Sequence, residues 1–133
     1  MKKYFDIGVR VVLSLILVMP VLGVLGIFPA PTADMYNTPQ AFQFITMLSE
    51  LGFYINYTIG IVAVLALIAL WTGRVALGAI LILPVTVNVI GFHLFLDGGL
   101  LTMGALLGNI MALINLYLIW VYRSAYQPLL RSV

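Results

Sequence analysis

The sequence contains no cysteine, one histidine and few charged residues. The missing cysteines exclude disulfides, thiol redox chemistry and thiolate metal sites. A single histidine does not favour a metal centre, which needs about three protein ligands. Charged residues make up 8% of the chain, against about a quarter in an average soluble domain. The formal net charge of +2 is too small to indicate the clustered basic face of a nucleic-acid-binding protein.

The chain is rich in apolar residues. They make up 64% of the 133 residues, and the mean hydropathy is +1.20. Each apolar run is close to the length that an α-helix needs to cross about 30 Å of hydrocarbon. A segment in lipid must satisfy its own backbone hydrogen bonds, so each run is expected to be a helix. The sequence predicts one all-α transmembrane domain over residues 1–133, with spans at about 7–28, 55–71, 75–96 and 100–122.

The connections between the apolar runs predict how the helices are arranged. The links 72–74 and 97–99 are very short, so successive spans are expected to be antiparallel neighbours in a four-helix bundle. In the long link before residue 55, Thr38 and Pro39 have the character of a helix N-cap and first turn. Apolar residues then recur at helical spacing. This pattern predicts a short amphipathic helix over 39–52 at the outer surface.

Charge predicts the orientation of these spans. Under the four-span interpretation, one side holds all the basic residues: Lys2, Lys3, Arg10, Arg74, Arg123 and Arg131. The other side holds three of the four acids, Asp34, Glu50 and Asp97. The positive-inside rule then places both termini in the cytoplasm of a bacterium whose inner membrane the protein spans.

Two features near the start of the chain leave alternatives open. Residues 1–20 could be a signal peptide, although the prolines around Ala30 make a poor cleavage site. Arg10 could extend to the cytoplasmic interface beside Asp6. Alternatively, it could face the bundle near Asn115, which is expected at a similar depth.

The candidate binding residues are polar side chains in the outer half of the predicted bundle. Polar groups inside apolar spans are costly and point to internal partners or to a site. Asn88 and Asn109 are expected about 12 to 13 Å below the outer surface, at one level of neighbouring spans. His93 precedes Asp97 by four residues, a spacing at which a carboxylate can orient an imidazole. We therefore predict an outward-opening pocket floored by the two amides and rimmed by His93, Asp97 and Tyr57.

Each of these residues also has a purely structural interpretation. The two amides could simply hold helices together through hydrogen bonds. His93 could be an interfacial residue bonded to Asp97. The small residues of the second span and the stripe containing Gly104 and Gly108 indicate close helix packing within the chain, with the face of a homo-oligomer as the alternative.

The second half of the chain resembles a known family. The resemblance is carried by PVTVNV at 84–89, FHLFLD at 92–97, the pair Tyr122-Arg123 and the sequence PLL at 128–130. These residues resemble the DoxX family of small bacterial membrane proteins, which is related to the membrane subunit of thiosulfate:quinone oxidoreductase. The resemblance covers residues 72–130 well and the first half weakly. The resemblance implies a four-helix inner-membrane protein, but it does not indicate which reaction, if any, the protein takes part in.

The leading functional expectation is a membrane subunit, or a binder of quinone or another small lipid, that serves a redox protein partner. An imidazole, amides and a tyrosine in an apolar slot could hold a quinone headgroup. Since no second redox group is evident, the chain is not expected to be an enzyme by itself, although it could be a subunit of a quinone-linked oxidoreductase. The alternatives are a structural or assembly protein without its own ligand and a transporter of small solutes.

Overall fold

The computed structural model describes residues 2–130, which form helices joined by turns and contain no strand. The helices are α1 (Lys2–Val24), η1 (Ala33–Met35), α2 (Pro39–Glu50), α3 (Phe53–Trp71), α4 (Val75–Phe95), α5 (Leu106–Val121) and η2 (Arg123–Leu130). The prediction of an all-α protein is therefore confirmed for this part of the chain.

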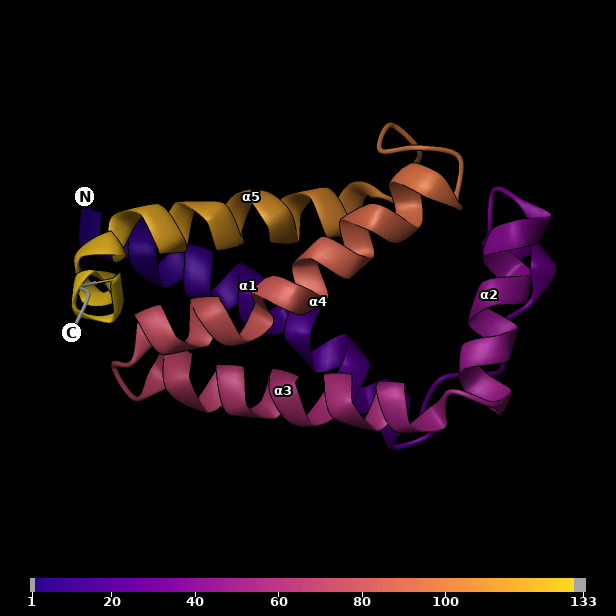
Figure 1. Cartoon of the computed structure of the whole chain (residues 1–133), viewed down its shortest axis with the longest axis horizontal. Helices are drawn as coiled ribbons and strands as arrows, with labels where there is room; N and C mark the ends of the chain where they lie inside the picture. Colours follow the sequence, from indigo (N-terminus) through magenta and orange to yellow (C-terminus); the bar gives the residue numbers. More distant parts are fainter. Residues whose placement is uncertain (1, 131–133) are drawn as a thin grey trace.

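Four of these helices lie lengthwise along the molecule in alternating directions (Figure 1). Helix α3 packs against α1 on one side and α4 on the other, and α4 packs against α5. Helix α2 lies across the opposite end of the molecule from the two termini (Figure 1). The interface between α1 and α5 is much smaller than the other three, so the helices form an open arrangement rather than an evenly closed bundle.

Three helices within the described residues are long and apolar enough to cross a membrane: Tyr4–Val24, Phe53–Trp71 and Val75–Phe95. Helix α5 has 16 residues, about 24 Å at the usual helical rise. Helix α5 is long enough to be a fourth candidate span only if η2 is counted with it, and the axes of these two helices differ by 67°. The chain is thus consistent with a membrane protein of three to four spans.

The last long helix begins at Leu106 rather than at residue 100, as the apolar pattern had suggested. Gly98 and Gly99 have φ values of +83° and +105°, which only glycine adopts easily. Thr102 Oγ1 donates to Gly99 O at 3.1 Å and accepts from Ala105 N at 3.3 Å. These bonds hold residues 98–105 as a compact turn, although leucines and a methionine make the segment look like part of a span.

The core lies where α1, α3, α4 and α5 meet. Its largest buried apolar side chains include Leu13, Leu17, Leu70, Ile82 and Leu118. The buried residues of α3 are mostly small, as its sequence pattern indicated: Gly60, Ala63, Ala66, Ala69 and Leu70. A Cβ added at Gly60 would lie 2.7 Å from Val24 Cγ2. Small residues therefore let the backbones of α1 and α3 approach closely.

The outer surface of the long helices is apolar as well. Large exposed side chains occur on all four of them, for example Leu15 (66%), Ile61 (61%), Val87 (61%) and Leu113 (69%). A protein in water rarely exposes so much contiguous apolar surface. The lengthwise faces of these helices are suited to contact with lipid.

Candidate functional site

A histidine and an aspartate meet at the end of α4, opposite the termini. His93 lies in the last turn of α4, and Asp97 follows the helix. His93 Nδ1 lies 3.0 Å from Asp97 Oδ2, and the two side chains are 13% and 2% exposed. The i,i+4 spacing in the sequence therefore produces the contact that it predicted.

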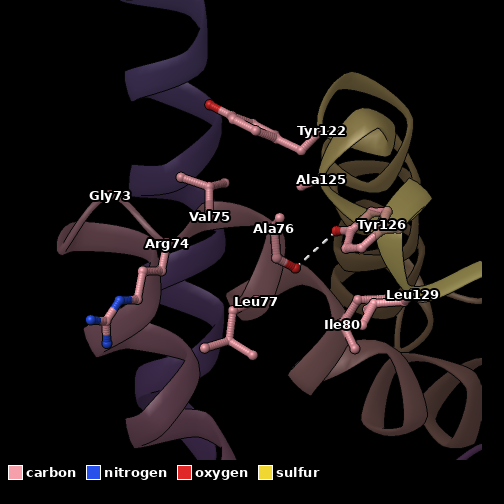
Figure 2. Close-up of a pocket in the computed structure, with 10 residues that line it drawn as sticks. All are labelled: Gly73, Arg74, Val75, Ala76, Leu77, Ile80, Tyr122, Ala125, Tyr126 and Leu129. Atoms are coloured by element: carbon pink, nitrogen blue, oxygen red, sulfur yellow. Dashed lines mark hydrogen bonds between the residues drawn. The ribbon is translucent and has the colours of Figure 1, made fainter.

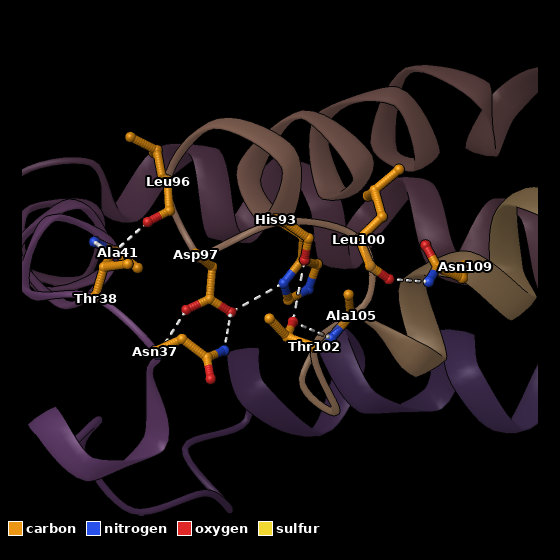
Figure 3. Close-up of polar contacts among 11 residues, drawn as sticks. Asn37, Thr38, Ala41, His93, Leu96, Asp97, Leu100, Thr102, Ala105 and Asn109 are labelled. Carbon is orange, nitrogen blue, oxygen red and sulfur yellow. Dashed lines mark hydrogen bonds and ion pairs between the residues drawn. The ribbon is translucent and has the colours of Figure 1, made fainter.

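The Asp97 carboxylate also binds the loop that precedes α2. Its Oδ1 accepts the Asn37 backbone N–H at 2.8 Å, and its Oδ2 accepts from Asn37 Nδ2 at 3.2 Å. Figure 3 shows Asn37 and His93 on opposite sides of this carboxylate. Thr38 strengthens the connection, because its hydroxyl donates to Leu96 O and accepts from Ala41 N at the start of α2. Asp97 thus joins two segments that are distant in the sequence.

Two glycines, Gly104 just before α5 and Gly108 in its first turn, let this part of the chain approach His93 and Asp97. A Cβ added at Gly104 would lie 3.3 Å from Asp97 Oδ2. One added at Gly108 would lie 3.5 Å from His93 Cδ2 and only 2.8 Å from Val89 Cγ1. The Gly104–Gly108 spacing, predicted to serve close packing, therefore leaves room for the imidazole between α4 and α5.

Asp97 determines what the imidazole can offer a ligand. When Nδ1–H donates to the carboxylate, the neutral ring presents Nε2 as a hydrogen-bond acceptor. Among residues 2–130, no protein group forms a hydrogen bond with Nε2.

Burial, and secondarily the negative charge of Asp97, raise the pKa of the neighbouring Tyr36 hydroxyl above its ordinary value. Tyr36 therefore stays neutral beside the carboxylate.

The two amides predicted to floor a pocket do not meet. Asn88 is exposed on α4, and its Nδ2 donates to Pro84 O of its own helix at 2.8 Å. Asn109 Nδ2 donates to Leu100 O at 2.7 Å. Five residues separate Asn88 from His93, which turns it about 140° around α4. The predicted common floor is therefore corrected: Asn88 turns away from His93 around α4, each amide bonds to backbone of its own helix or the adjoining turn, and α5 begins only at Leu106, so Asn109 lies in its first turn.

Tyr57 also lies apart from the histidine and aspartate. It is 53% exposed on α3, and its ring packs edge-on against Phe53 at 6.3 Å. In the described part of the chain, its hydroxyl has no protein hydrogen-bond partner. Of the five candidate residues, the structure joins His93 and Asp97 directly and places Asn109 on the neighbouring helix, one residue after Gly108.

A second polar cluster, which the sequence interpretation did not assemble, lies toward the termini. Arg10 Nη2 donates to Tyr122 Oη at 2.8 Å. The hydroxyl of Tyr117 donates to Asp6 Oδ1, also at 2.8 Å. Arg10 thus faces the other helices, but its hydrogen-bond partners are Tyr122 and, at 3.5 Å, Leu70 O rather than Asp6 or Asn115. The available signal was Arg10 itself, a cation inside an apolar run.

Asn115 occupies the middle of the core instead. It is fully buried, and its Nδ2 donates to Ala79 O at 2.8 Å. Its Oδ1 is buried and has no hydrogen-bond partner among residues 2–130. Asn115 therefore ties α5 to α4, which is the helix-joining role given above as the structural interpretation of Asn88 and Asn109.

Comparisons with known proteins add no further constraint. No family model matches the chain, and no curated protein or solved structure matches it. Within the described residues, no group of three or more histidine, cysteine, aspartate or glutamate side chains is placed to hold a metal ion.

Proposed function

We propose that this chain is a DoxX-like membrane subunit that binds a quinol-type lipid at His93 and serves a redox protein partner. The observation that supports this proposal is the fixed imidazole. Asp97 engages Nδ1 at 3.0 Å and is itself 2% exposed, so the neutral form of the ring presents Nε2 as an acceptor near the end of an apolar helix pair. A lipid headgroup that carries a hydroxyl is the complementary donor.

A quinol fits this arrangement better than a quinone. The hydroxyl of a quinol can donate to neutral Nε2, whereas a quinone carbonyl would require a doubly protonated imidazole. Asn109 Nδ2 gives one of its two hydrogens to Leu100 O, so a second contact from this amide would come from its remaining N–H or from its Oδ1. Because the chain has no cysteine and a single histidine, the partner protein would have to carry the electrons onward.

The proposal predicts that bound quinol or quinone depends on His93. The protein would be purified in mild detergent, and its lipids would be extracted and identified by mass spectrometry. Loss of one hydrogen bond to the headgroup should lower retention about tenfold in His93→Ala. Asn88→Leu is the matched control, since Asn88 faces outward and bonds its own helix.

Thermal unfolding of each variant separates lost binding from lost folding. His93→Gln, which keeps a polar side chain near Asp97, would be included if His93→Ala unfolds early. Equal retention by wild type and the folded histidine variants would contradict the proposal.

A structural role without a ligand is the second candidate, and one observation favours it. Both Asp97 oxygens are engaged by donors of the chain itself, from Asn37 and His93. In that case the polar groups would serve only to attach the loop before α2 to the end of α4. The lipid analysis distinguishes the two functions, because a purely structural protein would retain no specific quinol or quinone.

We also propose that the protein lies in a bacterial inner membrane with both termini in the cytoplasm. Both ends of the chain lie at one end of the molecule (Figure 1), and Arg10, Arg74 and Arg123 belong to that end. A reporter enzyme that is active only outside the cytoplasm should be inactive when fused after residue 133. The same reporter inserted between α1 and α2 should be active, and the reverse pattern would refute this orientation.

A further inference from the structure

A groove lies at the end of the molecule that holds both termini, away from His93. It has a volume of about 430 Å³ and opens between the start of α4 and η2 (Figure 2). Its apolar lining includes Leu77 and Ile80 of α4 and Leu129 of η2. Leu129 is 81% exposed, so the chain itself does not cover this apolar surface.

The groove is formed by the bend after α5. The chain turns by 67° between Val121 and Arg123, which directs η2 across the start of α4. Tyr126 then donates its hydroxyl to Ala76 O at 2.8 Å (Figure 2). This bond holds η2 at a distance from α4 that leaves the space between them open.

The surroundings of the groove are basic. Arg74 lines its rim and is exposed. Tyr122, which forms another part of the lining, accepts a hydrogen bond from Arg10. In the described range, no carboxylate lies within ion-pair distance of Arg10 or Arg74. The nearby acid, Asp6, is engaged by the Tyr117 hydroxyl.

We propose that this groove binds an anionic phospholipid, with an acyl chain between α4 and η2 and the phosphate beside Arg74. The apolar walls suit a hydrocarbon chain, and the unpaired cations favour a negative headgroup. Figure 2 shows the Arg74 guanidinium pointing away from η2, so the phosphate lies outside the groove at the membrane surface. A second copy in the same orientation is disfavoured, because its arginines would face these arginines.

Native mass spectrometry of the full chain tests this proposal. The protein would be released from micelles that contain equal amounts of phosphatidylglycerol and phosphatidylcholine. Wild type should retain phosphatidylglycerol in preference, and Arg74→Gln should lower that preference about fivefold, the effect of one basic residue at an anionic surface. Arg123→Gln is the charge-matched control, because Arg123 lies against Trp120 and outside the groove lining.

Blocking the groove tests the position of the acyl chain. Ala125 is exposed and lines the groove, so Ala125→Trp should remove bound phospholipid without lowering the thermal midpoint. Phosphatidylglycerol with a photoreactive group on one acyl chain should crosslink to Leu77, Ile80 or Leu129 in wild type, which requires no variant to fold. Equal retention of the two lipids by wild type, equal effects of Arg74→Gln and Arg123→Gln, or crosslinks confined to other faces would each overturn the proposal.

Discussion

Replacing Asp97 with alanine is expected to lower the free energy of unfolding by about 3 to 5 kcal/mol, because each donor left without its acceptor costs about 1 to 3 kcal/mol. The carboxylate is 2% exposed and accepts from Asn37 N, Asn37 Nδ2 and His93 Nδ1. Its removal would leave these donors without an acceptor in a site that water reaches poorly. The loop before α2 would also lose its attachment to the end of α4. Equilibrium unfolding in detergent micelles would measure the change.

Glu50→Ala is the control for Asp97→Ala. Glu50 also lies at the end opposite the termini, but it is exposed at the end of α2. Its removal should change the free energy of unfolding by no more than about 0.5 kcal/mol. If Asp97→Ala and Glu50→Ala were equally stable, the hydrogen bonds of Asp97 would contribute no more to the free energy of unfolding than an exposed charge does.

The second large effect is expected for Leu118→Ala, which should cost about 2 to 5 kcal/mol. Leu118 is fully buried and belongs to the core where the long helices meet. The truncated side chain would leave a cavity that rigid helices cannot close completely. In a membrane, the lost packing rather than transfer from water accounts for this cost, since lipid tails are as apolar as leucine.

Leu113→Ala on the same helix provides the matched comparison. Leu113 is 69% exposed, and lipid or detergent can fill the space that its side chain leaves. Its truncation should therefore cost less than about 1 kcal/mol. Unfolding of both variants under the same conditions would show the difference, and a larger cost for Leu113 than for Leu118 would contradict the observed rotation of α5.

Sequence reasoning succeeded where the structure depends on neighbours along the chain. Apolar runs of sufficient length predicted helices because a segment in lipid must satisfy its own backbone. Thr38 was expected to cap the following helix, and its hydroxyl accepts from Ala41 N at 3.1 Å. The contact between His93 and Asp97 followed from i,i+4 spacing in the same way.

Predictions about depth were insufficient to define the site. Equal depth placed Asn88 and Asn109 at one level, but each amide bonds to backbone near its own position in the sequence. The rotation of a helix about its axis depends on its packing against neighbours, and α4 is so uniformly apolar that its sequence hardly indicates which face is buried. The start of α5 was misplaced for a related reason, because hydrophobicity does not distinguish an apolar turn from a helix.

The amino-acid sequence by itself determined that this chain forms long apolar helices, that it lacks thiol chemistry, and that His93 lies one turn before Asp97. Only the tertiary structure decided that Asn37 completes the Asp97 network, that Arg10 meets Tyr122, and that Asn115 occupies the core. These partners are separated by many residues, and they come together only through the way the helices pack and turn against one another. Local hydrogen bonding and hydrophobicity follow from sequence, whereas contacts across helices depend on the shape of every side chain between them.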